Sequence, residues 1–239
     1  MPQDVLSNRP LYLQVRDALA ERIAKGTWRP GAAIPNESDL AREFGVSPGT
    51  TRKALDLIES ERLVTRRQGR GTFVNDQASE GLAIRFSNIR GADGERIVGQ
   101  VEAGEATEGK ANALERERLR LQAADHVYRI RRVQSHDGRP FMVEDVSMPA
   151  TIFPRLVEMN GVNHRIAILA QRHGVLLGKA QERISIGQAS PEAAEVLGIA
   201  PATAILSLDR VTQTLDGYPV EWRIGQCHLV GQHYLAEMT

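Results

Sequence analysis

Hydrophobic positions near the start of the chain follow the period of an α-helix. They recur at i, i+4, i+7, i+8 and i+12, which predicts an amphipathic helix that starts at Pro10 and ends at Gly26. The apolar stripe consists of Leu11, Val15, Ala18, Leu19 and Ile23. We expect this stripe to pack into a core.

The next two predicted helices meet at a tight corner. Asn36 can cap the first helix and Gly45 can end it, because glycine enters the left-handed conformation without a steric penalty. Ser47 is a second cap, and Pro48 fits the first helical position, where its missing N–H costs nothing. The second helix then has two faces. One face is mostly apolar and consists of Thr51, Ala54, Leu55 and Ile58. The opposite face is polar and consists of Gly49, Arg52, Lys53 and Asp56.

Two interpretations of this corner are open, a generic helical hairpin and a DNA-reading helix-turn-helix. The stretch that follows separates them. Segments 62–67 and 72–74 are β-prone and flank the glycine-bearing turn 68–71, which predicts a hairpin. Such a hairpin after a recognition helix is a wing, and its cations suit phosphates or the minor groove. These cations are Arg62, Arg66, Arg67 and Arg70. Nucleic-acid binding is therefore the favoured interpretation.

Residues 75–95 separate this region from the rest of the chain. They are polar and rich in glycine around the short apolar segment 82–86. We interpret them as a linker with a first strand, 82–86, docked on a second domain. A strand around 96–102 and a helix around 111–120 follow.

Two later stretches echo one another, 127–144 and 205–221. Each reads as strand, Asp-Gly turn and strand. A helix at 163–173, stopped by Gly174, lies between them, and the second stretch is preceded by a well-capped helix from Ser190 to Gly198. The pair suggests a duplicated unit with one antiparallel sheet, so the predicted fold class is α+β.

Composition sets further bounds. The 239 residues are enough for two domains, and the net charge of zero argues against a purely electrostatic DNA coat protein. Residues 1–77 hold 12 basic and 10 acidic side chains, so positive charge acts here by clustering in the wing and the recognition helix. No apolar run is long enough to span a membrane and Met1–Pro10 carries no secretory signal, which makes the cytoplasm the expected location.

Few residues suggest other chemistry. The single cysteine, Cys227, excludes an intramolecular disulfide and a cysteine-based zinc site, and it reads as a packed hydrophobe more readily than as an oxidant sensor. The histidines show no paired metal-binding spacing and no Walker-type loop is present, so we expect neither a metal nor a cofactor. No acid/base or nucleophile constellation is visible, and we expect no catalytic residue.

Motifs along residues 8–75 resemble the winged-helix domain of GntR-family bacterial transcription factors. In chain order they are Pro10-Leu11-Tyr12, Gln14-Val15, Gly26, Pro30-Gly31, Ile34-Pro35-Asn36-Glu37, Leu40-Ala41, Phe44-Gly45-Val46-Ser47, Thr50, Arg52-Lys53-Ala54-Leu55, Leu63-Val64 and Gly69-Arg70-Gly71-Thr72-Phe73-Val74. The resemblance implies a winged helix-turn-helix DNA-binding domain at 8–76. The residues expected at the DNA are Asn36, Ser47, Gly49, Thr50, Thr51, Arg52, Lys53, Arg67, Gln68, Gly69 and Arg70.

Within this set the expected roles differ. Arg52 and Lys53 should reach the major groove, Ser47, Thr50 and Thr51 should lie near phosphates, and the wing tip 68–70 should meet the minor groove or the backbone. Two positions depart from the family. Asn36 stands where serine is usual, and Pro48 stands where many members have an arginine that contacts a base. The family's usual operator is therefore not implied.

The layout of the second half resembles the ligand-sensing UTRA domain of the HutC branch of that family, which shares its fold with chorismate lyase. The resemblance implies a linker with a docked strand at 77–95 and an antiparallel-sheet effector and dimerisation domain at 96–237. The effector residues it implies are Arg132, Gln134, Glu144, His164, Glu221 and Arg223. Gln134 stands where the branch has a second arginine, and Asn163-His164 where a serine is common. The alternative is that Arg132–Glu144 and Arg223–Glu221 are ordinary surface or cross-strand ion pairs.

The resemblance leads to one expected function. We expect a DNA-binding transcriptional regulator, a metabolite-responsive repressor that binds a palindromic operator as a homodimer. The expected effector is a small polar metabolite with a carboxylate, because one strand arginine suits one planar anionic group. Two alternatives are a DNA-tethered enzyme with chorismate-lyase-like activity and an architectural DNA-binding protein that needs no ligand.

Overall fold

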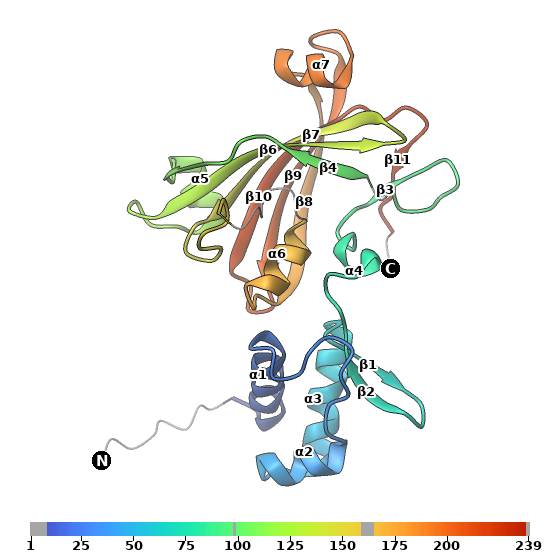
Figure 1. Cartoon of the computed structure of the whole chain (residues 1–239), viewed down its shortest axis with the longest axis vertical. Coiled ribbons are helices and arrows are strands. Elements are labelled where there is room, and N and C mark those ends of the chain that lie inside the picture. Colours follow the sequence, from blue (N-terminus) through green and yellow to red (C-terminus); the bar gives the residue numbers. More distant parts are fainter. Residues whose placement is uncertain (1–8, 98, 159–164, 238–239) are drawn as a thin grey trace. The chain divides into compact units, whose positions relative to one another are not determined.

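The computed structural model describes residues 9–97, 99–158 and 165–237. The chain divides into two compact units, Met1–Gln77 and Ala78–Thr239, and each is described by itself (Figure 1). Across the described ranges, none of the helices combines the length and the apolar character needed to cross a membrane.

The first unit is a winged helix-turn-helix. Its elements are α1 (Leu11–Ala24), α2 (Glu37–Phe44), α3 (Pro48–Ser60), β1 (Val64–Arg67) and β2 (Gly71–Val74). The caps are those expected from the sequence: the side chain of Asn36 accepts the N–H of Asp39, and that of Ser47 accepts the N–H of Thr50. Gly45, at a φ of 64°, makes the left-handed turn between α2 and α3.

Both α1 and α2 pack against α3. The predicted apolar face of α3 is buried, with Ala54 and Ile58 fully inaccessible, and Leu19 of α1 and Leu40 of α2 are fully inaccessible as well. The stripe of α1 differs in one respect: Leu11, the first residue of the helix, is 58% exposed. β1 and β2 then pair as the antiparallel wing, with Arg67 opposite Gly71.

The second unit is built on a seven-stranded antiparallel sheet in the order β4-β6-β7-β10-β9-β8, with β5 also paired to β6. The strands are β4 (Gln100–Ala103), β5 (Thr107–Lys110), β6 (His126–His136), β7 (Arg139–Pro149), β8 (Leu177–Gln188), β9 (Ala204–Thr214) and β10 (Pro219–Cys227). The helices are α4 (Glu80–Ala83), α5 (Ala113–Leu119), α6 (Ile166–Arg172) and α7 (Pro191–Leu197).

The sheet order confirms the internal duplication. One half runs β4/β5, α5, β6, β7 and the other runs β8, α7, β9, β10, and the two halves meet where β7 pairs with β10. Side chains alternate across the sheet, so Val146 and Met148 pack with α6 on one face while Val143 packs with α7 on the other. α5 lies on the same face as α7, against β10 and β7. Both predicted hairpins are present, with Gly138 and Gly217 at positive φ in their turns.

Four predicted elements differ from the structure, and one of them is the strand expected around 96–102, which begins only at Gln100 as β4. The strand expected at 82–86 is wrong: α4 and a turn occupy the segment, because a short apolar run does not by itself distinguish a strand from a helix. The strand within 77–95 is instead β3 (Ile89–Arg90), which pairs with the C-terminal β11 (His233–Tyr234). The helices expected at 111–120 and 163–173 are shorter, because Asn112 caps α5 and α6 begins only after Arg165.

Candidate functional sites

The first candidate site is the exposed face of α3. Ser47, Gly49, Arg52 and Lys53 are all exposed there, and a Cβ added at Gly49 would meet only the hydroxyl of Ser47, at 3.9 Å, so the backbone at Gly49 is open. Thr50 is partly buried and shares a hydrogen bond of 2.9 Å with the hydroxyl of Ser47. Asn36, also exposed, caps α2 next to this face. The surface therefore offers two cations, small hydroxyls and an uncovered backbone, which are groups that contact DNA.

Thr51 is a correction. Its side chain is completely buried on the core face of α3, and its backbone N–H donates to the carbonyl of Ser47. A helix cannot present the same residue to its core and to a groove. The predicted contact between Thr51 and a phosphate is therefore wrong.

The two cations of α3 are held in different ways. Arg52 makes a forked interaction with Glu37 of α2, with nitrogen–oxygen distances of 2.7 and 3.1 Å. The ammonium of Lys53 lies 3.8 Å from the centre of the Tyr12 ring of α1, a cation–π contact. Glu37 thus orients Arg52 at the corner of the motif, while Lys53 is directed toward α1.

The wing carries the remaining cations. Gln68, Gly69 and Arg70 form its exposed tip, and the positive φ of Gly69 fits the tight turn. Arg67 stacks over Phe73 of the facing strand, 4.8 Å from the ring centre. Arg66 pairs with Asp56 and Glu59 of α3 and so attaches the wing to the recognition helix.

The second candidate site is a pocket on the α6 side of the sheet. Arg132, Gln134, Glu144, Glu221 and Arg223 all line it, so the structure brings together every described residue of the predicted effector set. The sixth, His164, lies outside the described residues. The pocket encloses about 50 Å³ of free space, enough for a few water molecules.

The arginines and glutamates of this pocket form other ion pairs than Arg132–Glu144 and Arg223–Glu221, the pairs considered from the sequence. Arg132 and Glu144 face each other in the register of β6 and β7, yet Arg132 pairs with Glu221 at 3.6 Å and Arg223 pairs with Glu144. These are not surface pairs, because all four side chains are at most 11% exposed, although Arg223 and Glu144 do form a cross-strand pair between β10 and β7. They form one buried network across three strands.

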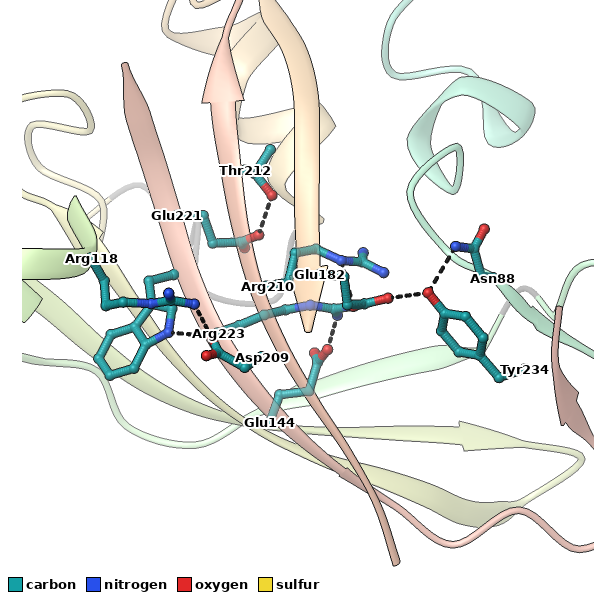
Figure 2. A network of polar contacts seen from close by, with 11 residues as sticks. Asn88, Arg118, Glu144, Glu182, Asp209, Arg210, Thr212, Glu221, Arg223 and Tyr234 are labelled. Atoms are coloured by element: carbon teal, nitrogen blue, oxygen red, sulfur yellow. Dashed lines mark hydrogen bonds and ion pairs between the residues drawn. The ribbon is translucent and has the colours of Figure 1, made fainter. Parts of the chain in front are cut away.

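Other residues of this network were missed in the sequence (Figure 2). Arg210 of β9 donates to Glu182 of β8 at 2.7 Å, and Glu182 accepts the hydroxyl of Tyr234 at 2.6 Å. Asn88 donates to the same hydroxyl at 2.9 Å. Arg165, at the start of α6, also lines the pocket and donates to the carbonyl of Gly99.

The internal repeat in the sequence contained a signal for Arg210, one of the residues that were missed. Val127–Val133 aligns with Ile205–Val211, which sets Arg210 at the position of Arg132, just as Glu221 echoes Glu144. Both arginines and both glutamates line the pocket. No comparable pattern marks Arg165, Asn88 or Tyr234, which reach the pocket from outside the two hairpins.

Burial shifts protonation in this network. It lowers the pKa of Arg132 and Arg165, lowers the pKa of Arg223 to about 10, and raises the pKa of Glu221. Arg223 therefore stays protonated at neutral pH. Four guanidinium groups (Arg132, Arg165, Arg210 and Arg223) meet three carboxylates (Glu144, Glu182 and Glu221), so the network has one surplus positive charge when all are ionised.

Two other features bear on alternative chemistry. Within the described part of the chain, no group of three or more His, Cys, Asp or Glu residues is arranged to hold a metal ion. Cys227 is 1% exposed, and burial raises the pKa of its thiol to about 12. This fits the interpretation of Cys227 as a packed hydrophobe.

Comparison with known proteins agrees with this two-part architecture. A model of the UTRA domain matches residues 98–229, and a model of the bacterial regulatory proteins of the gntR family matches residues 11–74. The chain is 27% identical to the Escherichia coli mannosyl-D-glycerate transport/metabolism system repressor MngR, over 92% of this chain and 90% of that protein. It is 26% identical to the Bacillus subtilis transcriptional repressor NagR, over 89% and 88% of the two chains.

A solved structure gives the same result for the second unit. It is the ligand-binding domain assigned to a GntR-family transcriptional regulator from Bordetella bronchiseptica, with a TM-score of 0.58 and 26% identity, and it covers 64% of this chain and 97% of that one. Together the exposed face of α3, the wing and the pocket define a DNA-binding transcriptional regulator with a separate effector unit. The chain belongs to the GntR family, in the HutC branch whose members carry a UTRA domain. Its relatives are named as transcriptional regulators, which favours this class over a DNA-tethered enzyme.

Proposed function

We propose that this protein is a cytoplasmic, metabolite-responsive repressor that binds a palindromic operator as a homodimer. The observation that carries the proposal is the buried network around Arg132, Arg223, Glu144 and Glu221 in a unit separate from the DNA-reading helix. Burying four charged side chains is costly for folding, and a ligand that needs them is a reason to retain them. The names of MngR and NagR support the repressor role. A ligand-independent architectural protein would have no use for such a pocket.

We propose that the effector is a small polar molecule with one carboxylate. The surplus of one positive charge matches a monoanion better than a dianionic phosphate, and the glutamates favour a ligand that also has hydroxyl, amide or amine donors. Gln134 removes the second strand arginine that would complete a bidentate phosphate site. MngR is named as the repressor of a mannosyl-D-glycerate transport/metabolism system, and a carboxylate-bearing metabolite is in keeping with that name.

The DNA contacts proposed from the sequence remain, except that Thr51 is removed and the role of Lys53 changes. Arg52 reads a base from the position that Glu37 sets, and Ser47, Gly49 and Thr50 approach phosphates. Because the ammonium of Lys53 contacts the ring of Tyr12, Lys53 contacts the DNA backbone or a flanking base. Arg67, Gln68, Gly69 and Arg70 of the wing contact the minor groove or the backbone.

The effect of ligand binding is transmitted to the linker by residues in the wall of the pocket. Ile84, Asn88 and Ile89 line the pocket, and they directly follow the segment around Ala78, whose N–H donates to Gln171 of α6 at 2.9 Å. A metabolite is larger than the present cavity, so its entry moves wall residues. A ligand that prefers one arrangement of this wall then shifts the spacing or mobility of the winged domains and so changes DNA affinity.

One experiment tests the proposal. The operator is selected from genomic DNA near the gene, and its binding is measured by fluorescence anisotropy with sugar acids such as gluconate and glucuronate, and with glucose 6-phosphate as the contrasting anion. We expect a carboxylate ligand to weaken operator binding and to be detected by calorimetry. Tight binding of a sugar phosphate would overturn the ligand class, and operator binding that no metabolite changes would overturn the regulatory role.

A further inference from the structure

The two edges of the seven-stranded sheet are built differently. One edge consists of the short strands β4 and β5, interrupted between Ala103 and Thr107 and carrying Glu102, Glu108 and Lys110. The other edge is β8, a continuous strand from Leu177 to Gln188 that pairs only with β9 among the described strands. Short and charged edges resist pairing with another chain, whereas a long edge strand is a ready template for it.

The outer part of β8 is exposed and apolar. Arg183, Ile184, Ser185 and Ile186 are all exposed in succession, a run not found in β6, β7, β9 or β10. Ile186 is 83% exposed and Ile184 is 46% exposed, while Leu208, opposite Ile184 on β9, is 1% exposed. The apolar face of the sheet therefore continues past its covered part and stops uncovered at the edge.

We propose that β8 pairs in antiparallel fashion with β8 of a second copy of this chain, with the two-fold axis at Ser185. This inference rests on the proposed homodimer and specifies where its two chains meet. A two-fold axis perpendicular to a sheet places one residue of the edge strand opposite itself, and residues equally far on either side then face each other. The register can therefore be argued from side-chain chemistry.

Like charges exclude two registers. An axis at Glu182 or at Arg183 would place two carboxylates or two guanidinium groups directly opposite each other. An axis at Ile184 would set Ile186 against Glu182 of the partner subunit, and an axis at Ile186 would set Ile184 against Gln188 of the partner subunit.

An axis at Ser185 avoids these conflicts. Ile184 then faces Ile186 of the partner subunit, and by symmetry the same contact forms twice. Arg183 faces Gly187 of the partner subunit, which leaves room for its long side chain. The pairing joins the two sheets by main-chain hydrogen bonds and covers the exposed isoleucines on both chains.

Cysteine cross-linking in the full-length protein tests the register. In Ser185→Cys the two new thiols lie opposite each other, with α-carbons roughly 4.5–5.5 Å apart, a separation that a disulfide spans. In the control Arg183→Cys the two thiols are displaced by four residues, roughly 13 Å along the strand. Under mild oxidation we expect a covalent dimer from Ser185→Cys and none from Arg183→Cys or from the wild type, whose Cys227 is buried.

Sedimentation tests the surface itself. Ile186→Lys places a lysine in each apolar contact, and we expect the dimer dissociation constant to rise by at least ~100-fold. Tyr218→Lys, at another exposed apolar position (67% exposed) in the β9–β10 turn, is the matched control and should leave it unchanged. Because both side chains are exposed, thermal unfolding of the monomer should be the same in the two variants.

The outcomes separate this inference from the proposed function. A wild-type dimer that persists in Ile186→Lys and is not cross-linked in Ser185→Cys overturns pairing at β8 and leaves the homodimer intact. A wild-type protein that sediments as a monomer at micromolar concentration overturns the homodimer as well. Cross-linking of Arg183→Cys but not of Ser185→Cys would overturn the register.

Discussion

Arg223 of β10 is ion-paired with Glu144 of β7, although Gly225 is the residue that faces Glu144 in the strand register. Gly225 has no side chain, and the place that a Cβ would take is filled by Met142, whose sulfur would lie 2.8 Å from it. Arg223, which faces Val146 in the register, reaches diagonally to Glu144. Arg132, which does face Glu144, pairs instead with Glu221.

The buried Arg223–Glu144 pair predicts a strong effect on stability. Glu144→Ala removes the nearer carboxylate of the buried guanidinium of Arg223 and leaves only Glu182, at 3.7 Å, which we expect to lower the free energy of unfolding by up to about 3–5 kcal/mol. Urea denaturation followed by circular dichroism measures this. The control is Asp145→Ala on the other face of β7, where the pair with Arg131 is half exposed and is worth roughly 0–1 kcal/mol. Equal losses in the two variants would contradict the buried network.

The place of Arg132 in the pocket predicts that its substitution abolishes the response to the effector without affecting DNA binding. Arg132→Ala should leave operator affinity intact and make it insensitive to the effector, because one charged hydrogen bond to a buried ligand is worth roughly 1.5–3 kcal/mol. Operator titrations with and without the ligand found by calorimetry measure both properties. If a phosphorylated sugar binds tightly and Arg132→Ala leaves its affinity unchanged, the site and the ligand class are both wrong.

Arg52 predicts a loss of sequence discrimination. Arg52→Ala should cost about 1–3 kcal/mol on the selected operator and much less on random DNA, since a base contact is lost only where the base is correct. Arg155→Ala, an equal change of charge at an exposed site of the second unit, is the control and should alter neither affinity. Equal losses on the two DNAs would remove Arg52 from the base-reading role.

Arg67 predicts a change in salt dependence. Arg67→Ala should weaken binding to operator and random DNA alike and lower the slope of log affinity against log salt by about one, because one phosphate contact is lost. Arg67→Lys keeps the charge near Phe73 and should keep the slope. A slope that Arg67→Ala leaves unchanged would mean that this arginine serves the wing alone.

The buried thiol of Cys227 leads us to expect that the stability of the folded protein decreases at alkaline pH. Its pKa is raised from 9 in the unfolded chain to about 12 in the folded protein, so below about pH 9 both states keep the proton and stability is unaffected. Between about pH 9 and 12 the unfolded state loses its proton first, and this contribution to stability falls as pH rises. Cys227→Ala should flatten that part of the pH profile of denaturation. At pH 8 the thiol of the folded wild type should not react with Ellman's reagent, and rapid reaction would contradict its burial.

Local chemistry in the sequence determined most of the first unit and the plan of the second. Asn36, Gly45, Ser47 and Pro48 fixed the ends of two helices through hydrogen bonds and backbone conformations that depend on near neighbours. The Asp-Gly turns likewise fixed both hairpins, and the repeat revealed the duplicated sheet. The same kind of reasoning failed at 82–86, where a short apolar run left strand and helix equally open.

What the tertiary structure decided is which side chains meet. Alternation along β6 and β10 shows which face a residue takes, but the crossing of Arg132 to Glu221 and of Arg223 to Glu144 depends on the order of β6, β7 and β10 in the sheet. Asn88 and Tyr234 join the pocket only because β3 pairs with β11 from opposite ends of the unit. Such contacts follow from packing between distant segments, and no local pattern in the sequence encodes them.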